Sequence, residues 1–130
     1  MDENTSFVID ASSVISFLLP DETTEPITEI FQKYKSGEIR LISTILLPFE
    51  VLNSLKVALL RKRLNSNLID EIAKTYIDLK IPLKEINYLY ALNLAIKTNL
   101  SYYDAAYLQL SEEMGLPLLT LDNKLKALAR

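Results

Sequence analysis

The 130-residue sequence contains no cysteine and no histidine. Their absence excludes disulfides, thiol nucleophiles, zinc fingers, Ser-His-Asp triads and imidazole general bases. Any catalysis must therefore use oxygen ligands, hydroxyl groups, lysine or arginine.

Long hydrophobic runs are also missing. No apolar stretch approaches the roughly 18 residues that a membrane-spanning helix needs. The first ten residues, MDENTSFVID, have neither the basic segment nor the apolar centre of a signal peptide. We therefore expect a cytoplasmic protein with no membrane partner.

The charge balance lacks the basic excess that is typical of nucleic-acid-binding proteins, since 14 Lys and Arg face 17 Asp and Glu, for a net charge of −3. This counts against a nucleic-acid function but does not exclude one, because acids that surround divalent cations would have their charge offset locally. The hydrophobic fraction of 49% and the charged fraction of 24% are ordinary for a globular protein. We expect a single domain that spans residues 1–130.

Short apolar runs alternate with segments of helical periodicity, which predicts an α/β fold with a parallel sheet and helices on both faces. The short helix after the first strand is expected to be capped by Ser12 or Ser13. The predicted strands or extended segments are Ser6–Ile9, Ile39–Ser43, Ile81–Leu83 and Leu116–Leu121, and the predicted helices are 12–19, 26–36, 48–63, 68–79, 86–97, 104–114 and 124–130.

Four acidic residues stand at or near the junctions of these elements. Asp10 and Asp122 follow predicted strands, and Asp104 and Glu50 lie near the starts of apolar helices. Asp10 and Asp122 are also suitable helix N-caps, and an acid such as Asp104 is favoured in a first helical turn. Glu50 lies among apolar neighbours without the Ser or Thr of a capping box, so its carboxylate is expected to have a partner.

The four acids are better explained by a shared pocket than by four separate capping roles. The carboxyl ends of parallel strands form the edge of a sheet where ligands bind. Four carboxylates in one pocket repel one another unless they are protonated or bound to cations. Ligand sets made only of oxygen favour Mg²⁺ or Mn²⁺, and such ions suit the hydrolysis of phosphate esters.

Four segments also resemble the PIN-domain ribonucleases, and within them the VapC-type toxins of prokaryotic toxin–antitoxin pairs. In chain order these segments are VIDASSVISFLL (Val8 to Leu19), LPFEVLNSL (Leu47 to Leu55), LSYYDAAYLQL (Leu100 to Leu110) and LPLLTLDNKL (Leu116 to Leu125). The resemblance implies a three-layer α/β/α sandwich, a metal-dependent endoribonuclease activity, a homodimer and a cognate antitoxin.

The resemblance also implies roles for individual residues. It assigns Asp10, Glu50, Asp104 and Asp122 as the acidic quartet that binds Mg²⁺ or Mn²⁺. Our hypothesis is that Asp10 and Asp104 hold an ion directly, with Glu50 and Asp122 binding this ion or a second one directly or through water. Ser12 and Thr120 occupy the hydroxyl positions that steady the acids. Asn123 stands where some relatives carry a further acid, which leaves one ion or two open.

Basic and aromatic residues supply candidate RNA contacts. Tyr102 and Tyr103 flank the proposed site and are candidates for stacking on a base, although at least one of them is expected in the core. The segment from Leu68 to Tyr90 is more apolar than a small core requires, which predicts an exposed patch. The candidate phosphate contacts are Lys56, Arg61, Lys62 and Arg63, with Lys33, Lys35 and Arg40 as a second group, and a solvated helix end is the alternative interpretation for each.

Two other classes of function are weighed against a ribonuclease. A response-regulator-like receiver also gathers acids around Mg²⁺, but it needs adjacent acids after the first strand, and Asp10 is followed by Ala11. A non-catalytic PIN-like module that binds protein or RNA partners stays open, and metal-dependent cleavage would separate it from an enzyme.

Overall fold

The computed structural model describes residues 5–129, and this part of the chain forms seven helices and four strands. The strands are β1 (Thr5–Ile9), β2 (Ile39–Thr44), β3 (Leu83–Lys84) and β4 (Leu118–Leu119). The helices are α1 (Ala11–Leu18), α2 (Glu25–Ser36), α3 (Leu47–Leu60), α4 (Ser66–Leu79), α5 (Tyr88–Thr98), α6 (Tyr102–Met114) and α7 (Asn123–Leu128).

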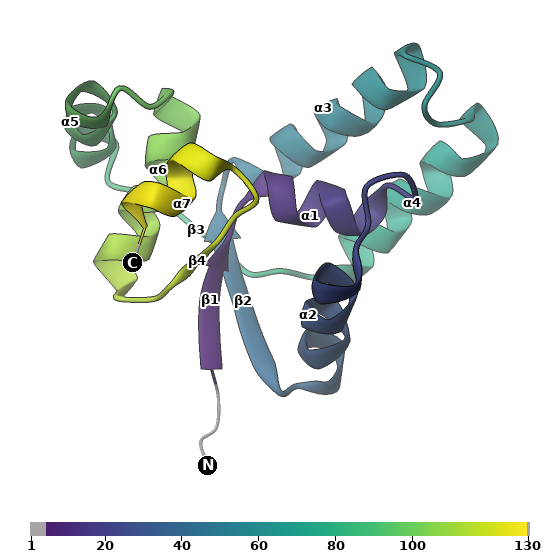
Figure 1. Ribbon diagram of the computed structural model, residues 1–130, viewed down its shortest axis with the longest axis horizontal. Coiled ribbons are helices and arrows are strands. Elements are labelled where there is room, and N and C mark those ends of the chain that lie inside the picture. Colours follow the sequence, from purple (N-terminus) through teal and green to yellow (C-terminus); the bar gives the residue numbers. More distant parts are fainter. Residues whose placement is uncertain (1–4, 130) are drawn as a thin grey trace.

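The four strands form one parallel sheet in the order β3-β2-β1-β4. β1 pairs with β2 from Thr5↔Ile39 to Val8↔Ile42, and its end pairs with β4 through Ile9↔Leu119. Because all strands run the same way, their carboxyl ends share one edge, at which α1 and α3 begin (Figure 1). The predicted α/β class is confirmed.

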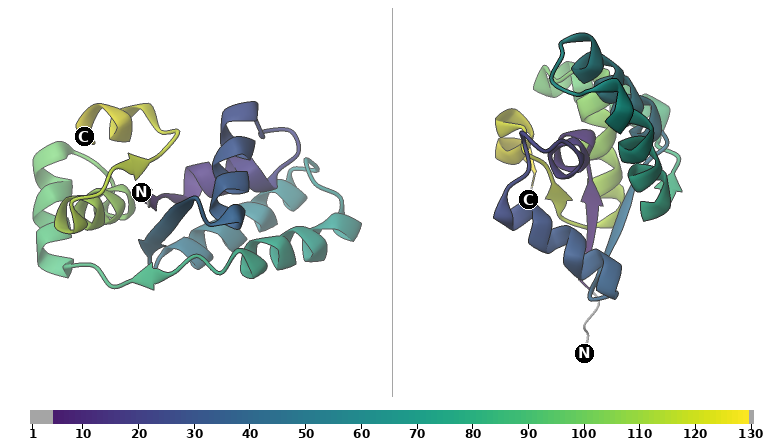
Figure 2. Two further views of the ribbon diagram at one scale, coloured as in Figure 1. Left: turned by 90° about the horizontal axis from the view of Figure 1, so that it is seen from below. Right: turned by 90° about the vertical axis from the view of Figure 1, so that its right-hand side faces the viewer.

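Helices cover both faces of the sheet, so the molecule has three layers. Helix α6 packs on β1 and β2, and α5 packs against α6 on the outside. On the opposite face α2 packs against β2 and α1, while α3 and α4 pack together next to α1 (Figures 1 and 2). The central strand β1 is therefore enclosed, which explains why Val8 and Ile9 are fully buried.

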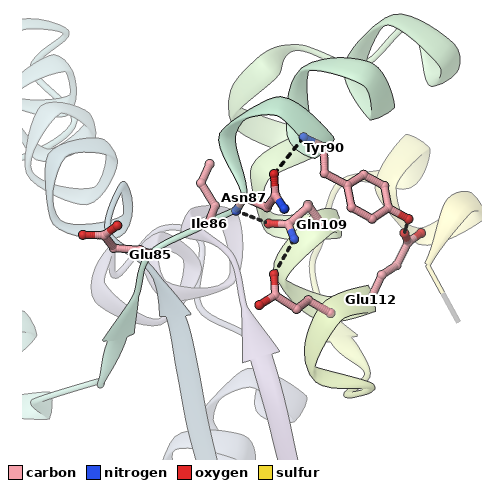
Figure 3. A pocket seen from close by; sticks show the side chains of 7 residues that line it. Glu85, Ile86, Asn87, Tyr90, Gln109 and Glu112 are labelled. Carbon is pink, nitrogen blue, oxygen red and sulfur yellow. Dashed lines mark hydrogen bonds between the residues drawn. The ribbon is translucent and has the colours of Figure 1, made fainter.

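A buried polar side chain, Gln109, connects helices α5 and α6. Gln109 of α6 accepts a hydrogen bond from the backbone N–H of Asn87 at 3.0 Å, and its amide donates to Glu113 at 2.6 Å (Figure 3). A buried amide requires such partners. These bonds tie the start of α5 to α6 beside a pocket of about 360 Å³ that Tyr90 and Glu112 also line.

Several predicted boundaries differ from the structure. Helix α3 begins at Leu47 and ends at Leu60 instead of running to Arg63, because Lys62 has a left-handed φ of 59°. The prediction that Ser12 or Ser13 caps α1 was wrong, whereas the capping interpretation of Asp10 is correct, because its side chain accepts from the backbone N–H of Ser13.

Elements in the second half of the chain also shift by a few residues. Strand β3 is Leu83–Lys84 instead of residues 81–83, and α5 begins at Tyr88 after the cap Asn87. Helix α7 ends at Leu128 before the predicted end at Arg130, which lies outside the described residues. Within residues 5–129, no helix combines the length and the hydropathy needed to cross a membrane.

Candidate active site

Asp10 lies at the carboxyl end of β1 and is only 3% exposed. One carboxylate oxygen accepts from the hydroxyl of Ser12 at 2.8 Å and from the backbone N–H of Ser13 at 3.1 Å. The other accepts from the hydroxyl of Thr120 at 2.6 Å. Burial raises the pKa of Asp10, while these three hydrogen bonds lower it and the charge of Asp104 raises it further.

Ser12 and Thr120 hold Asp10 from two distant parts of the chain. Their hydroxyl oxygens are 3.4 Å apart, and Ser12 also accepts from the backbone N–H of Leu121 at 3.0 Å. Both hydroxyl groups that were expected to steady the acids therefore donate to Asp10.

Glu50 lies in the first turn of α3 and is half-buried. The hydroxyl of Tyr107, from the middle of α6, donates to its Oε1 at 2.5 Å. Burial raises the pKa of Glu50, the bond from Tyr107 lowers it, and the charges of Asp104 and Asp10 raise it. The partner that the apolar surroundings of Glu50 predicted is therefore Tyr107.

Asp104 lies in the first turn of α6, half-buried, after the capping residue Ser101. Burial raises its pKa, as does the charge of Asp122, while Ser101 and Lys124 lower it. Asp122 is exposed and caps α7 by accepting from the backbone N–H of Leu125 at 2.9 Å. The capping interpretation of Asp122 is correct for its structural role and leaves a ligand role open.

The four acids come from different elements and interact electrostatically in pairs: Asp10 with Asp104, Glu50 with both of these, and Asp104 with Asp122. Within residues 5–129 no three acidic side chains are already arranged to hold one metal ion. The donor set nevertheless fits Mg²⁺, because Mg²⁺ binds through one or two carboxylates and keeps several waters. A divalent cation would also relieve the mutual repulsion of these acids.

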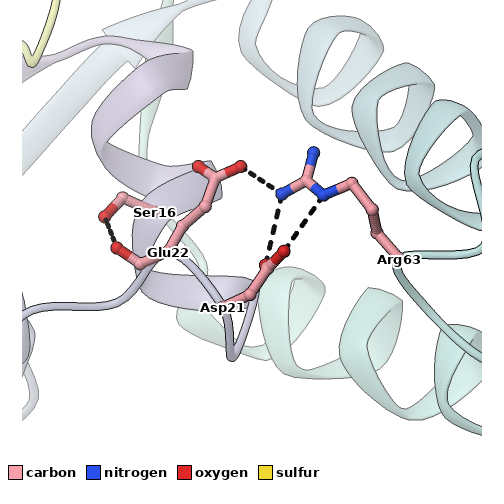
Figure 4. Close-up of polar contacts among 4 residues, drawn as sticks. All are labelled: Ser16, Asp21, Glu22 and Arg63. Atoms are coloured by element: carbon pink, nitrogen blue, oxygen red, sulfur yellow. Dashed lines mark hydrogen bonds and ion pairs between the residues drawn. The ribbon is translucent and has the colours of Figure 1, made fainter.

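The basic residues proposed for RNA contact lie at different distances from the acids. A helical rise of about 1.5 Å per residue puts Lys56 roughly 9 Å and Arg61 roughly 16 Å along α3 from Glu50. Lys56 and Arg61 are exposed, as is Lys62. Arg63 is already engaged, because it forms ion pairs with Asp21 and Glu22 (Figure 4).

The second basic group is less suited to the site. Arg40 lies near the start of β2, at the opposite end of the sheet from the acids, and Lys35 sits 5.2 Å from the ring centroid of Phe17. Lys33 lies in the last turn of α2. These positions are remote from the carboxyl edge of the sheet.

The two tyrosines beside Asp104 have different environments. Tyr102 packs against the core and donates to the carbonyl oxygen of Tyr88 at 3.1 Å, whereas Tyr103 is 55% exposed. The expectation that at least one belongs to the core is confirmed, and Tyr103 is left as the stacking candidate.

Sequence analysis did not single out Tyr107 or Lys124 for a role at the site. Tyr107 is 1% exposed and matches the apolar pattern of α6, so only its position three residues after Asp104, on the same helical face, hinted at a role. Lys124 donates to the carbonyl oxygen of Asn99 at 2.6 Å and provides a positive charge near Asp104. Its position two residues after Asp122 was the available signal.

Comparison with known proteins agrees with this architecture. The chain is 33% identical over 122 residues to Ribonuclease VapC3 of Pyrobaculum aerophilum, and the alignment covers 91% of this chain and 90% of that protein. The crystal structure of PAE2754 from Pyrobaculum aerophilum has a TM-score of 0.75 and 22% sequence identity, and it covers 95% of this chain and 78% of that one, which supports the fold. The model of the PIN domain matches residues 7–130, and the chain therefore belongs to the PIN-domain family.

Proposed function

We propose that this protein is a metal-dependent endoribonuclease that hydrolyses RNA phosphodiester bonds as the toxin of a toxin–antitoxin pair. The observation that carries the proposal is the position of four acids in a PIN-domain chain: Asp10 follows β1, Glu50 and Asp104 lie in the first turns of α3 and α6, and Asp122 caps α7. The similarity to Ribonuclease VapC3 supports RNA as the substrate. Such a toxin would act on RNA in the cytoplasm.

The residues of the proposed site have different roles. Asp10 and Asp104 would hold Mg²⁺ or Mn²⁺ directly, with Glu50 and Asp122 as further ligands, directly or through water. When bound, the ion supplies activation of a water molecule and compensation of the charge on the scissile phosphate. Ser12 and Thr120 keep the carboxylate of Asp10 in place, because each donates to a different oxygen of it.

RNA would reach this site across exposed side chains of α3 and α6. Lys56 lies closer to Glu50 along α3 than Arg61 or Lys62 and is the best placed of the proposed phosphate contacts. Tyr103, one residue before Asp104, offers an exposed ring on which a base can stack. Asp104 would then lie next to the bound nucleotide.

Protein partners would use exposed apolar side chains, of which Leu89 lies in the predicted segment from Leu68 to Tyr90 and Leu92 and Ile96 lie just beyond it. On α5, Leu89, Leu92 and Ile96 recur at helical spacing, and Leu89 and Ile96 are 74% and 72% exposed. We propose that a homodimer and the cognate antitoxin cover such surfaces. Light scattering on the 14.8 kDa chain would give the assembly mass directly.

Cleavage of a fluorescently labelled single-stranded RNA tests the enzymatic proposal. The wild type should cleave with Mn²⁺ or Mg²⁺ and stop with EDTA. Asp104→Asn should lose at least a hundredfold in rate, whereas Asp70→Asn, an exposed acid on α4, should cleave like the wild type. RNA binding without metal-dependent cleavage would favour the alternative, a non-catalytic PIN-like module.

A further inference from the structure

We propose that Tyr107 is a positioning residue that orients the Glu50 carboxylate for binding the divalent cation. This inference rests on the proposed function and deepens it, because it adds to the four acids a residue that does not itself touch the ion or the RNA.

The contact joins two helices on opposite faces of the sheet. Tyr107 of α6 and Glu50 of α3 are 57 positions apart in sequence, yet the Tyr107 hydroxyl donates to Glu50 Oε1 at 2.5 Å. The Tyr107 ring is 1% exposed, so packing fixes its position. The site therefore has a rigid donor aimed at one oxygen of a half-buried carboxylate.

Glu50 needs such support because its side chain is flexible. A glutamate has three rotatable side-chain bonds, and each must be fixed before its carboxylate can bind an ion with defined geometry. Among residues 5–129, Tyr107 donates the one hydrogen bond found to the Glu50 side chain. This bond occupies Oε1 and leaves Oε2 available to bind an ion.

Helix α6 links two proposed ligands through this contact. Asp104 and Tyr107 lie three positions apart and therefore share one helical face. Asp104 is itself a proposed ligand, and Tyr107, on the same helix, would orient the Glu50 carboxylate of α3. Groups that hydrogen-bond to a ligand in this way typically change metal affinity by about 10- to 100-fold when removed.

Calorimetric titration of the full chain with Mn²⁺ tests the role of Tyr107. Tyr107→Phe should weaken Mn²⁺ binding at least tenfold. Tyr34→Phe is the matched control, because it removes a hydroxyl that donates to the carbonyl oxygen of Leu79 at 2.7 Å, away from the acids, and it should bind like the wild type. Thermal unfolding without metal shows whether each variant is folded.

Combination with Glu50→Gln separates positioning from a general structural effect. If Tyr107 acts through Glu50, the double variant should bind Mn²⁺ no more weakly than Glu50→Gln alone. Glu50→Asp provides a test that keeps Tyr107 intact, because it retains the charge but withdraws the carboxylate by one methylene. It should also lose about tenfold in affinity.

Three results would overturn the inference. The first is a Mn²⁺ affinity of Tyr107→Phe equal to that of the wild type, and the second is the same result for Glu50→Asp. The third is a double variant in which the losses of Tyr107→Phe and Glu50→Gln add. If wild-type cleavage still depends on Mn²⁺ in any of these cases, the proposed function stands and only the role of Tyr107 fails. A wild type that neither binds Mn²⁺ nor cleaves RNA would overturn both.

Discussion

Replacement of Asp10 by asparagine separates its structural role from its proposed ligand role. Asparagine keeps an oxygen that can accept from the backbone N–H of Ser13, so the cap of α1 should survive. The new amide group faces Thr120, whose hydroxyl can accept as well as donate. The charge, which a cation requires, is lost.

Without metal, the expected change in stability is small because two effects oppose each other. Hydrogen bonds to a charged acceptor contribute about 1 kcal/mol more than neutral ones, and this part is lost. The variant also removes the burial of a charge and its repulsion by Asp104, which both raise the pKa of Asp10, and this relief opposes the loss. We expect the free energy of unfolding to change by less than about 1.5 kcal/mol.

With metal, the wild type and the variant should diverge. Mn²⁺ at a hundredfold excess over its Kd stabilises a folded protein by about 2.7 kcal/mol, or roughly 10 °C in Tm for a chain of this size. Asp10→Asn should show little of this rise. Asp70→Asn, which also removes one negative charge, controls for nonspecific binding and should shift like the wild type.

Thermal unfolding followed by circular dichroism, with and without Mn²⁺, measures both effects. A Mn²⁺-dependent rise in Asp10→Asn equal to that of the wild type would refute Asp10 as a ligand. A loss of more than about 3 kcal/mol without metal would show that asparagine does not preserve the local structure.

Two further predictions concern pH and the basic end of α3. Burial raises the pKa of Asp10, Glu50 and Asp104 above the ordinary values of 3.8 for Asp and 4.5 for Glu. The folded state therefore binds protons more readily than the unfolded state. The free energy of unfolding should fall as pH rises from about 4 through the raised pKa values. Urea denaturation in EDTA across this range would contradict the assignment if stability rose instead. Arg63→Ala should lower the free energy of unfolding by less than about 1 kcal/mol, and by less still at high salt, because its ion pairs are exposed; a larger loss in urea denaturation would show that they are not screened.

Most of the fold was predictable because its signals are local. The run before Asp10 and the stops at Gly37 and Gly115, which both have a positive φ, mark elements without knowledge of the tertiary structure. Strand β3 was harder, because it has two residues, Leu83 and Lys84, both of them exposed. Its pairing with the end of β2 defines it as a strand, and no local pattern encodes that pairing.

The site was predictable only in part, for the same reason. The acids stand at junctions that a parallel sheet brings to one edge, so topology alone predicted their proximity. The partner of Glu50 depends on a contact between α3 and α6, and Tyr107 looks in sequence like any aromatic core residue. Arg63 looked like a free cation, yet its partner Asp21 lies 42 positions away.

Capping and metal binding are not competing roles for Asp10. An ionised carboxylate has about four acceptor sites, and Ser12, Ser13 and Thr120 fill three of them. The hydrogen bonds that cap α1 thus orient the carboxylate and leave about one site for a cation. Glu50, with one site filled by Tyr107, keeps about three. A proposed ion would then receive one bond from Asp10 and need its remaining ligands from the other acids and from water, which matches the way Mg²⁺ is usually held.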